Sequence, residues 1–387
     1  MKHFDYIIAG GGCSGRSLAV RMLPYLSASG KNVLLVDKEL KKGNDKTWCF
    51  WEEKPDIFEP VVYRKWERLS FSSSLLNLEL NILPYQYKMI RSADFYSHTD
   101  DQLAENKQIT RINGNVEKLY TEKELANVVI DGEVYTADYV FSSIPQAQEK
   151  RPDRYQYLLQ HFEGWVIETE GQIFNPDSAT LMDFNTPQQA GTSFVYVLPF
   201  DSNRALVEYT VFSEKEFSAE SYTAALEQYI AEQLHCGAYT IKVKEYGVIP
   251  MSDHPIKRKQ DRIIYLGTAG GFTKGSTGYT FRFIQKHTAA IVENLIEHGD
   301  PGISEGTAER FNTYDGILLH LLSSGSLSGE KIFSTMFQKN SPGRILKFLD
   351  NETSIVEELQ LFSTLQKKAF ALAFLKRTLR LMRIKDK

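Results

Sequence analysis

Three glycines near the start of the chain have the type and spacing that dinucleotide binding requires. Gly10, Gly12 and Gly15 form the pattern G-x-G-x-x-G between an apolar, β-forming run at 4–9 and a segment with helical spacing at 16–26. The glycines permit a tight turn and a close approach of the backbone to a pyrophosphate, which the amides at the helix N-terminus then face. The sequence therefore predicts a strand, a glycine turn and a helix that bind a dinucleotide.

A carboxylate further along the chain makes this motif more specific. The segment 33–36 is a second apolar run, and Asp37 follows it, 22 positions after Gly15. An acid at the end of the second strand can accept hydrogen bonds from the ribose hydroxyls. The motif alone does not distinguish FAD from NAD. We assign the following residues to cofactor binding: Gly10, Gly12, Ser14, Gly15 and Asp37.

The elements that must position these residues follow from the hydrophobic pattern. The N-terminal part alternates strand and helix signals, which is typical of an α/β, Rossmann-like domain with a sheet that is mostly parallel. Its other expected elements are a hairpin of 127–130 and 134–135 around Asp131-Gly132, a returning strand at 137–142, a strand entering a glycine turn at 262–267, and a helix at 278–297.

The middle and the end of the chain have different patterns. Short alternating or aromatic strands with Asn, Asp and Pro between them prevail from 164 to 210, which predicts a separate antiparallel sheet. From about residue 302 helix formers prevail, with breaks at 323–328 and at Pro342-Gly343. The nucleotide-binding domain is therefore expected to be discontinuous.

Composition excludes several classes of protein. The 387 residues carry 45 Lys and Arg against 49 Asp and Glu, a net charge of −4, so the uniformly basic surface of a general nucleic-acid binder is absent. With 42% hydrophobic residues the chain can bury ordinary cores. The apolar start is too short for a secretory leader, and no run approaches the ~18 apolar residues of a membrane span. We therefore expect a cytoplasmic protein without a spanning helix.

Neither cysteine nor histidine suggests a metal site. Cys13, Cys49 and Cys236 are widely spaced and form no CxxC pair, which favours a reducing compartment over a disulfide framework. The eight histidines show no metal-ligand spacing. We assign no metal.

Further blocks follow one another in a fixed order along the chain. They read NDKTWCFW at 44–51, LMDF at 181–184, FVYVLPF at 194–200 with ALVEYT at 205–210, and IPM at 249–251 with GTAG at 267–270 and STGY at 276–279. Together with the glycine motif, these blocks resemble the lycopene β-cyclase family of FAD-dependent enzymes that form carotenoid rings. The resemblance covers most of the chain and is weakest at its C-terminal end.

The chain departs from the pattern of this family in three places. Tyr209 replaces the second carboxylate that many members carry beside the first, so we expect no paired-carboxylate mechanism at that point. Asn185 stands where a basic residue often follows the Met-Asp-aromatic block. The loop 271–275 reads GFTKG in place of the commoner His-Pro, which leaves the loop geometry beside the flavin open.

The resemblance implies a redox-neutral isomerisation, that of an intramolecular lyase. The terminal ψ-end alkene of lycopene is protonated, a neighbouring double bond attacks the tertiary cation, and a proton is lost to leave a β-ionone ring. Glu208, the acid of the ALVEYT block, is the implied catalytic acid and base, because desolvation would favour its neutral carboxyl group. The alternative is an exposed or salt-bridged strand glutamate.

The resemblance further implies bound FAD that acts in its reduced form, with NAD(P)H only as an external reductant. Reduced flavin either stabilises the cation electrostatically or assists proton transfer, and the sequence does not choose between these roles. A strand end with small residues and a helix start are interpreted as a second flavin contact, although a glycine-rich surface turn has the same pattern. The residues of this contact are Gly267, Thr268, Ala269, Thr277 and Gly278.

Other side chains in the matching blocks remain open between a functional and a structural role. Aromatic faces stabilise cations, but each of these rings can equally be plain core. Asp183 either helps to position the flavin or the acid, or caps a turn. The aromatic candidates are Trp48, Phe50, Trp51, Phe194, Tyr196 and Phe200.

The last segment of the chain suggests a membrane contact. Residues 367–387 contain eight basic residues and one acid, interleaved with apolar side chains. A helix there is basic and amphipathic, and such a helix can lie on an anionic bilayer, in which a carotenoid dissolves. The alternative is a docked terminal helix with a solvated basic face. We therefore expect peripheral association with the inner face of the cell membrane.

These observations lead to one interpretation with two alternatives. We expect a glutathione-reductase-like FAD-binding domain formed by 1–60, 85–150 and 245–300, a β-rich substrate domain formed by 61–84 and 151–244, and a helical region at 301–387. The expected function is that of a lycopene β-cyclase that makes β-carotene through γ-carotene. The alternatives are a lipid-active FAD oxidoreductase, such as a geranylgeranyl-type reductase or a monooxygenase, and a prenyl-lipid escort protein without turnover. The substrate range, the number and type of rings, and the oligomeric state stay open.

Overall fold

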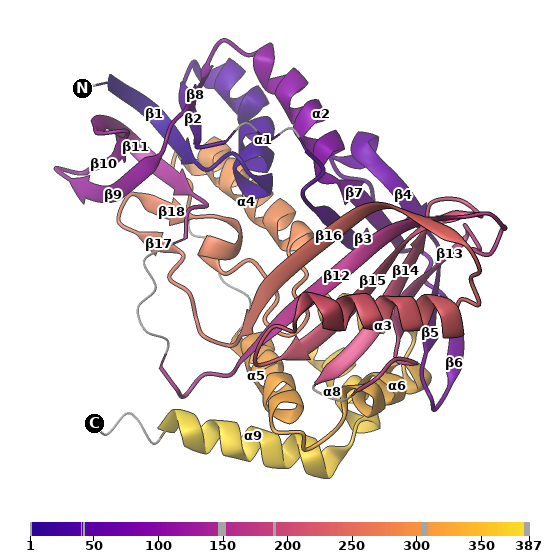
Figure 1. Ribbon diagram of the computed structural model, residues 1–387. Helices are drawn as coiled ribbons and strands as arrows, with labels where there is room; N and C mark the ends of the chain where they lie inside the picture. The colour runs from indigo at the N-terminus through magenta and orange to yellow at the C-terminus, as the bar shows by residue number, and fades with distance from the viewer. Residues whose placement is uncertain are drawn as a thin grey trace.

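The computed structural model describes residues 2–39, 41, 43–145, 152–188, 191–302 and 309–382. Its strands form three sheets of eight, seven and three strands, and its longer helices cover them. In Figure 1 the eight-stranded sheet lies at the upper left, the seven-stranded sheet at the lower right, and the C-terminal helices below it, with α9 along the lower edge. The expected α/β class with a β-rich second part and a helical C-terminal part is confirmed.

The eight-stranded sheet is the expected nucleotide-binding sheet. Its strand order is β17-β18-β11-β1-β2-β8, and the neighbours from β18 to β8 run parallel, while β9 and β10 form a hairpin with β11. The hairpin around Asp131-Gly132 is confirmed, and β11 is also the expected returning strand. The strands are β1 (Lys2–Ala9), β2 (Val33–Asp37), β8 (Ile109–Asn113), β9 (Val116–Glu122), β10 (Leu125–Ile130), β11 (Glu133–Ser142), β17 (Lys259–Gln260) and β18 (Ile263–Tyr265).

Different layers cover the two faces of this sheet. Helices α1 (Cys13–Ser29) and α4 (Phe281–His298) pack on one face through Leu18, Met22 and Ile291, which are almost fully buried. The β9–β10 hairpin covers the other face, where Ala126 and Val128 meet the opposite side of β1 and β2. Side chains alternate between faces along a strand, so these adjacent apolar runs fill both cores.

The seven-stranded sheet has the order β16-β12-β15-β14-β13-β5-β6 and is antiparallel except where β13 meets β5. Helix α3 (Ala219–Glu232) covers one face through a buried cluster that includes Trp165, Val207 and Leu226. The opposite face packs on the small sheet and on the C-terminal helices. The strands are β5 (Arg68–Ser72), β6 (Asn77–Asn81), β12 (Tyr157–Thr169), β13 (Ser178–Asp183), β14 (Thr192–Pro199), β15 (Arg204–Ser213) and β16 (Tyr239–Ser252).

The small sheet links the two large ones. It consists of β3 (Thr47–Glu52), β7 (Gln86–Arg91) and β4 (Val62–Trp66), with the short helix η1 (Glu59–Val61) before β4 and α2 (Ser92–Ala104) after β7. Trp51, Tyr87 and Trp66 belong to the same buried cluster as the inner face of the seven-stranded sheet. The Thr-Trp block of the sequence is therefore the strand that lies over that face.

The C-terminal helices close this core from the other side. They are α5 (Glu309–Ser323), α6 (Gly329–Lys339), α7 (Pro342–Leu349), α8 (Ile355–Thr364) and α9 (Lys367–Met382). The expected break at 323–328 separates α5 from α6. Pro342, by contrast, begins α7, because proline fits the first turn of a helix, where its missing N–H has no partner to lose.

Two predicted boundaries differ from the structure. Helix α4 begins at Phe281 and not at Gly278, because Gly278 has a φ of +73°, which ends helical geometry. Strand β16 belongs to the seven-stranded sheet, although the predicted nucleotide-binding segment starts at residue 245. The proposed division of the chain into domains otherwise stays a prediction.

Candidate active site

The first glycine turn has the geometry of a phosphate cradle. Gly10 has a φ of +105°, and a Cβ on Gly15 would lie 2.0 Å from the Gly10 carbonyl oxygen, so neither position tolerates a side chain. A Cβ on Gly12, by contrast, would meet nothing within 4 Å. Gly12 is also the N-cap of α1, where no side chain caps the helix. The turn therefore presents open space and helix amides on one side, as an anionic ligand requires.

Asp37 lies at the expected place beside this turn. Its Oδ2 accepts a hydrogen bond from the Gly11 amide at 3.1 Å, and its Oδ1 accepts one from the Glu39 amide at 3.2 Å. The carboxylate is thus fixed at the carboxyl end of β2, next to the glycine turn. This placement suits a contact with the ribose of a bound dinucleotide.

The second glycine turn packs against the first. The 3-10 helix η2 (Gly267–Gly270) follows β18, and Gly267 has a φ of +56°. A Cβ on Gly267 would lie 2.8 Å from the Oγ of Ser14, at the start of α1. The structure therefore brings together Ser14 and the segment that contains Thr268 and Ala269, which lie far apart in the sequence.

Thr277 and Gly278 lie in a turn before α4 and not in its first turn. The Gly278 amide donates to the Lys274 carbonyl oxygen at 2.9 Å, and a Cβ on Gly278 would lie 2.4 Å from Oε1 of Gln160 on β12. The Oγ1 of Thr277 and the Oε1 of Gln160 are buried and have no hydrogen-bond partner. Unpaired buried polar atoms beside two glycine turns fit a polar planar ligand such as FAD.

Glu208 lies on the inner face of the seven-stranded sheet, in a row of residues from four adjacent strands. The register places Glu245 of β16 and Glu208 of β15 on either side of Gly164 of β12, and Tyr196 of β14 on the far side of Glu208. Strands lie about 4.8 Å apart, so the two glutamates start from backbones roughly 10 Å apart. Because Gly164 has no side chain, the two carboxyl groups meet above it.

Gly164 is necessary for this arrangement. A Cβ there would lie 3.0 Å from Cγ of Glu245 and 3.0 Å from Cδ1 of Leu206, which is tighter than ordinary contact. A threonine hydroxyl group donates a hydrogen bond to each of the two carboxyl groups. Thr47 Oγ1 donates to Glu245 Oε2 at 2.8 Å, and Thr210 Oγ1 donates to Glu208 Oε1 at 2.9 Å.

The electrostatics of the pair favour one retained proton. Burial raises the pKa of Glu208 well above its usual value, and the neighbouring Glu245 carboxylate raises it further. Burial also raises the pKa of Glu245, against the hydrogen bonds from Thr47 and Glu208, which lower it. Within the described residues neither carboxyl group forms an ion pair. Both directions favour a proton that the pair retains.

Aromatic side chains surround the pair on the side away from the sheet. Trp51 packs edge to face on Tyr279 at 4.6 Å between ring centroids, and Tyr87 and Tyr279 place their hydroxyl groups 3.5 Å apart. Burial raises the pKa of Tyr196 and of Tyr87 well above their usual values, so both phenols are neutral. The result is an electron-rich environment without a cationic side chain among the described residues.

The other aromatic candidates lie elsewhere. Trp48 and Phe50 pack on Phe281 and Phe95 at the start of α4, in a separate buried cluster. Phe194 is fully buried between Phe184, Tyr196 and Phe212, and Phe200 packs on Tyr63. Of the six candidates, Tyr196 is the one that pairs directly with Glu208, and Trp51 packs on Tyr279 and Tyr87 near it.

Asp183 has the structural role that the sequence left open. Its Oδ1 accepts hydrogen bonds from the backbone and side-chain amides of Asn185, both at 2.9 Å, and its Oδ2 accepts one from the Tyr229 hydroxyl at 2.7 Å. This is a side-chain capped turn at the end of β13. The same contacts account for Asn185.

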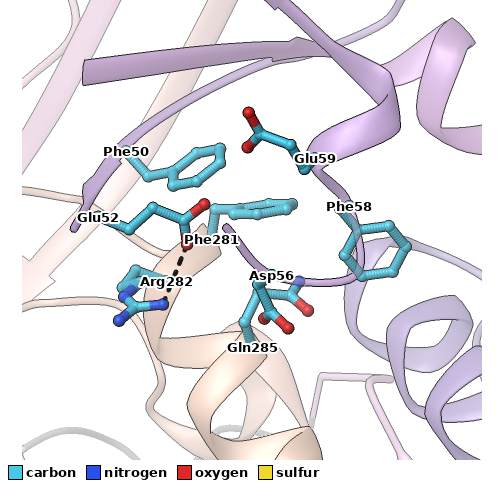
Figure 2. A pocket seen from close by; sticks show the side chains of 8 residues that line it. All are labelled: Phe50, Glu52, Asp56, Phe58, Glu59, Phe281, Arg282 and Gln285. Atoms are coloured by element: carbon cyan, nitrogen blue, oxygen red, sulfur yellow. Dashed lines mark hydrogen bonds and ion pairs between the residues drawn. The ribbon is translucent and has the colours of Figure 1, made fainter. Parts of the chain in front are cut away.

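A second buried acid, Glu52, is neutralised by cations and is not a comparable candidate. Lys88 donates to Glu52 Oε1 at 3.0 Å, and Arg282 donates to Oε2 at 3.2 Å. Figure 2 shows the Glu52–Arg282 pair beside Phe50 and Phe281, around a cavity of about 10 Å³, which is close to the space of one water. We interpret this cluster as a structural contact that joins β3 to α4.

Glu245 is the site residue that sequence reasoning missed, because the prediction considered only the position beside Glu208 in the sequence. Tyr209 does replace a carboxylate next in sequence, but it points to the other face of the sheet and is buried under α3. The second carboxyl group instead comes from β16, two strands away. One signal was present: Glu245 falls in the same two-residue alternation as Ile249 and Met251, where the other residues are apolar.

Helix α9 is amphipathic, as expected, although residues 383–387 of the predicted basic segment lie outside the described residues. It is fixed to the body by the buried Ala373 and by Arg377, whose Nε donates to Asp253 Oδ2 at 2.9 Å. Its outer face exposes about half of each apolar side chain at five positions: Leu372, Phe374, Leu375, Leu379 and Met382. No helix in the described part of the chain is both long and apolar enough to cross a bilayer.

Comparison with protein families gives a match over nearly the whole chain. The model of the family described as lycopene cyclase protein matches residues 5–376. A lycopene beta-cyclase of Pantoea ananas is 24% identical over 323 residues, which cover 76% of this chain and 78% of that protein. A lycopene beta-cyclase of Pseudescherichia vulneris is 25% identical over 272 residues, 64% of this chain and 62% of that protein.

Solved structures show the same fold at low identity. A flavoprotein/dehydrogenase of Cytophaga hutchinsonii has a TM-score of 0.65 and 11% identity, over 97% of this chain and 100% of that chain. A geranylgeranyl bacteriochlorophyll reductase-like protein of Thermoplasma acidophilum has a TM-score of 0.61 and 12% identity, over 95% of this chain and 98% of that chain. The expected flavoprotein fold is therefore confirmed.

Proposed function

The chain belongs to the lycopene cyclase family, and from this premise we propose that it is a lycopene β-cyclase. It converts the ψ-ends of lycopene to β-ionone rings, and thus lycopene to β-carotene through γ-carotene. The reaction is an isomerisation, in which one proton enters and one leaves and no electrons are lost.

One observation carries this proposal: a carboxyl group with a strongly raised pKa stands on the inner face of the sheet beside neutral aromatic side chains. Burial and Glu245 disfavour the charged form of Glu208 and so raise its pKa. A general acid works best when its pKa lies near the operating pH. Alkene protonation needs such an acid, and the carbocation that follows needs surroundings without a cationic side chain.

The side chains at the site account for the individual steps. Glu208 donates its proton to the terminal alkene, and the neighbouring double bond then closes the ring on the tertiary cation. The faces of Trp51 and Tyr196 and the carboxylate charge stabilise that cation. A ring C–H bond then breaks, its electron pair forms the ring double bond, and the proton returns to the carboxylate.

FAD fits the two glycine turns described above. Gly10, Gly12 and Gly15 with the amides of α1 would hold its pyrophosphate, and Asp37 its ribose. The turns at 267–270 and 277–278 would hold the flavin part, where Thr277 Oγ1 lacks a partner. Reduced FAD would supply negative charge near the developing cation, and NAD(P)H would serve only as an external reductant.

A bilayer surface is the proposed source of the substrate. Helix α9 presents apolar side chains to solvent next to its basic residues, and α8 presents Ile355, Val356 and Leu359, each 64% exposed. Apolar side chains rimmed by Lys and Arg are typical of proteins that lie on anionic membranes. Carotenoids dissolve in the bilayer, so such contact brings enzyme and substrate together.

The alternative enzyme is a flavin-dependent reductase of prenyl lipids, which the fold also permits. Its support is the fold similarity to the reductase-like protein of Thermoplasma acidophilum, which at 12% identity extends to the fold alone. A reductase consumes reductant stoichiometrically and adds hydrogen to its product, whereas a cyclase leaves the mass unchanged.

Expression in a lycopene-accumulating bacterium tests the proposal. We expect β-carotene of unchanged mass, identified by chromatography and mass spectrometry. The variant Glu208→Gln should keep its bound FAD, measured by absorbance of the purified protein, and lose cyclisation at least about a hundredfold, as loss of a general acid requires. A heavier product would indicate a reductase, and unchanged lycopene with the native chain would favour an escort protein.

A further inference from the structure

We propose that Glu245 is a positioning residue of the reaction: its carboxylate holds the proton on Glu208 and completes a pair that shares one proton. This inference rests on the proposed cyclase function and adds a second residue to it. It follows from the sheet register, from Gly164 and from the two threonine hydrogen bonds.

Geometry fixes the contact between the two acids. Glu245 and Glu208 face each other across Gly164, and Thr47 anchors Glu245 from the strand that lies over the sheet. A hydrogen bond between two carboxyl groups requires a proton on one of them. A threonine hydroxyl group donates to each acid, while burial and the Glu245 charge together raise the pKa of Glu208, so we assign the shared proton to Glu208.

The pair also differs from two other buried acids, Glu52 and Glu358 of α8, in its lack of cations. Glu52 contacts Lys88 and Arg282, and Glu358 contacts Arg310, so those acids are balanced. In the part of the chain that the structure describes, Glu208 and Glu245 have only threonines and each other as polar partners. Without a cation nearby, ionisation of both buried acids has a high free-energy cost, so the pair keeps one proton.

This arrangement assigns a role to Glu245 at each stage of the reaction. Before the reaction its charge favours the protonated form of Glu208. When Glu208 has given its proton to the alkene carbon, two carboxylates face one carbocation and stabilise it. When the ring C–H bond breaks, its electron pair forms the ring double bond, and the proton returns to the pair, so that atoms and charge balance.

The pH dependence of activity tests this role. In Glu245→Gln the amide keeps a partner for Thr47 but removes the charge, so the pKa of Glu208 should fall. We expect the alkaline limb of the rate profile to move to lower pH by about one unit or more, with FAD still bound. Glu245→Asp, which restores the charge, should move the limb back toward that of the native chain.

Glu163 provides a matched control. It lies next to Gly164 on β12 but faces the other side of the sheet, where it accepts a hydrogen bond from Trp165 at 2.7 Å. Glu163→Gln should leave the pH profile unchanged. An unchanged profile in Glu245→Gln would overturn the inference, and so would equal inactivity of the Gln and Asp variants with FAD retained.

A second measurement separates this inference from the proposed reaction. The free energy of unfolding of Glu208→Gln, Glu245→Gln and the double variant, measured against pH, forms a double-mutant cycle that needs no substrate. We expect a coupling of the two positions that grows as pH rises. Absence of coupling at any pH refutes the shared proton even in an active cyclase, whereas clear coupling in a chain without cyclase activity refutes the reaction alone.

An independent observation points to a second site, a cavity of about 270 Å³ among the C-terminal helices. Its walls are almost entirely apolar, and its few polar side chains, such as Ser276 and Asp315, gather at one place, where Asp315 is held by Lys274 at 2.8 Å. The apolar wall includes Ile317, Leu318, Ile332, Met336, Leu361 and Phe374. Apolar cavities of this kind stay dry and accept apolar ligands.

We infer that this cavity binds the part of the polyene chain that is not being cyclised. Met336 and Leu361 belong to the same apolar cluster as Trp51, and Tyr196 and Tyr279 pack against that cluster beside the glutamates. Phe374, which also lines the cavity, is half exposed on the outer face of α9. The cavity thus borders helix α9 and the apolar cluster against which Tyr196 and Tyr279 pack. A long linear carotenoid with one end at Glu208 needs such an apolar space for the rest of its chain.

Pigment retention tests this site without turnover. Glu208→Gln protein purified from lycopene-accumulating cells should carry carotenoid, measured by absorbance relative to FAD. Adding Leu318→Trp, which fills the cavity, should reduce the retained pigment at least tenfold, while Ile296→Trp, on an exposed position of α4, should not. Thermal melts identify any variant that fails to fold, and for these Ile332→Phe replaces Leu318→Trp. Equal pigment in folded cavity-filled and control proteins would overturn the inference, as would the absence of pigment from all of them.

Discussion

Ionisation of Glu208 is coupled to folding. Its folded pKa lies well above that of an unfolded glutamate, so the folded protein binds more protons than the unfolded chain between these two values. The free energy of unfolding must then fall as pH rises through that window. Because glutamine does not ionise, the variant Glu208→Gln should not lose stability in this way as pH rises.

We therefore expect Glu208→Gln to gain stability relative to the native chain as pH rises above the pKa of an unfolded glutamate. The gain should amount to about 1.4 kcal/mol for each unit by which folding raises the pKa. Denaturant unfolding at several pH values measures it, with Glu163→Gln as the control. A difference that stays constant with pH would contradict the raised pKa.

At the residue scale the sequence predicted the contacts that lie close together along the chain. The glycine turn and Asp37 follow from one strand-turn-helix unit and the strand after it, and the structure has them as expected. The contact of Glu208 with Glu245 depends on a strand pairing and on an empty position at Gly164, which lies in a third strand. Local sequence carries no information about such a pairing, so Glu245 was missed.

At the scale of elements, the two sides of α9 differ in their contacts. Its inner side fastens the helix through Ala373 and the Arg377–Asp253 pair, and its outer side is apolar and exposed. Deleting the helix would leave Asp253 buried without its partner, which costs roughly 3–5 kcal/mol. Point substitutions on the outer side are therefore the better test of membrane contact.

The triple variant Leu372→Ser, Leu375→Ser and Leu379→Ser should bind anionic liposomes at least about tenfold more weakly, because each leucine loses apolar area that lipid would cover. Sedimentation with vesicles of anionic lipid measures the partitioning. Ile296→Ser, an exposed apolar position on α4, is the control. Equal liposome binding by the native chain, the triple variant and the Ile296→Ser control would refute the docking role of α9.

Element boundaries were predicted less well than element types. The hairpin at Asp131-Gly132 follows from turn chemistry that is strictly local. The start of α4 was placed too early because Gly278 takes a left-handed conformation in order to pass Gln160 of another sheet. Tertiary contact, and not helix propensity, decides where that helix begins.

On the scale of the whole molecule, the proposed FAD site joins segments from both ends of the nucleotide-binding sheet. Gly10 to Gly15 and the turn at Gly267 are in contact, so a ligand that bridges them should stabilise the native state. Excess FAD at about 100 times its Kd adds roughly 2.7 kcal/mol to the free energy of unfolding.

We therefore expect FAD to raise the Tm of the native chain by several degrees and to leave that of Gly15→Ala unchanged. The methyl group that this substitution adds would lie 2.0 Å from a backbone oxygen and would force the turn to shift. Differential scanning calorimetry with and without FAD measures the effect. Gly43→Ala, where a Cβ meets nothing within 4 Å, should respond like the native chain.

The overall architecture was more predictable than its internal boundaries. The G-x-G-x-x-G unit, the β-rich middle and the helical end each have a composition that indicates their class, and all three are present. The place of β16 was not predictable, because its partner β12 lies far away in the sequence. Which sheet a strand joins is decided by long-range pairing.

The alternation of side chains along β16 makes the site sensitive to chain length. Glu245 pairs with Gly164, while its neighbours Lys244 and Tyr246 point to the opposite face. An insertion or deletion of one residue inside this strand would turn Glu245 to the opposite face of the sheet. A neighbouring side chain would then face Glu208, with the fold largely intact. Loss of two residues would keep the facing side but move the acid out of line with Glu208. Length variation within the strand therefore separates folding from catalysis.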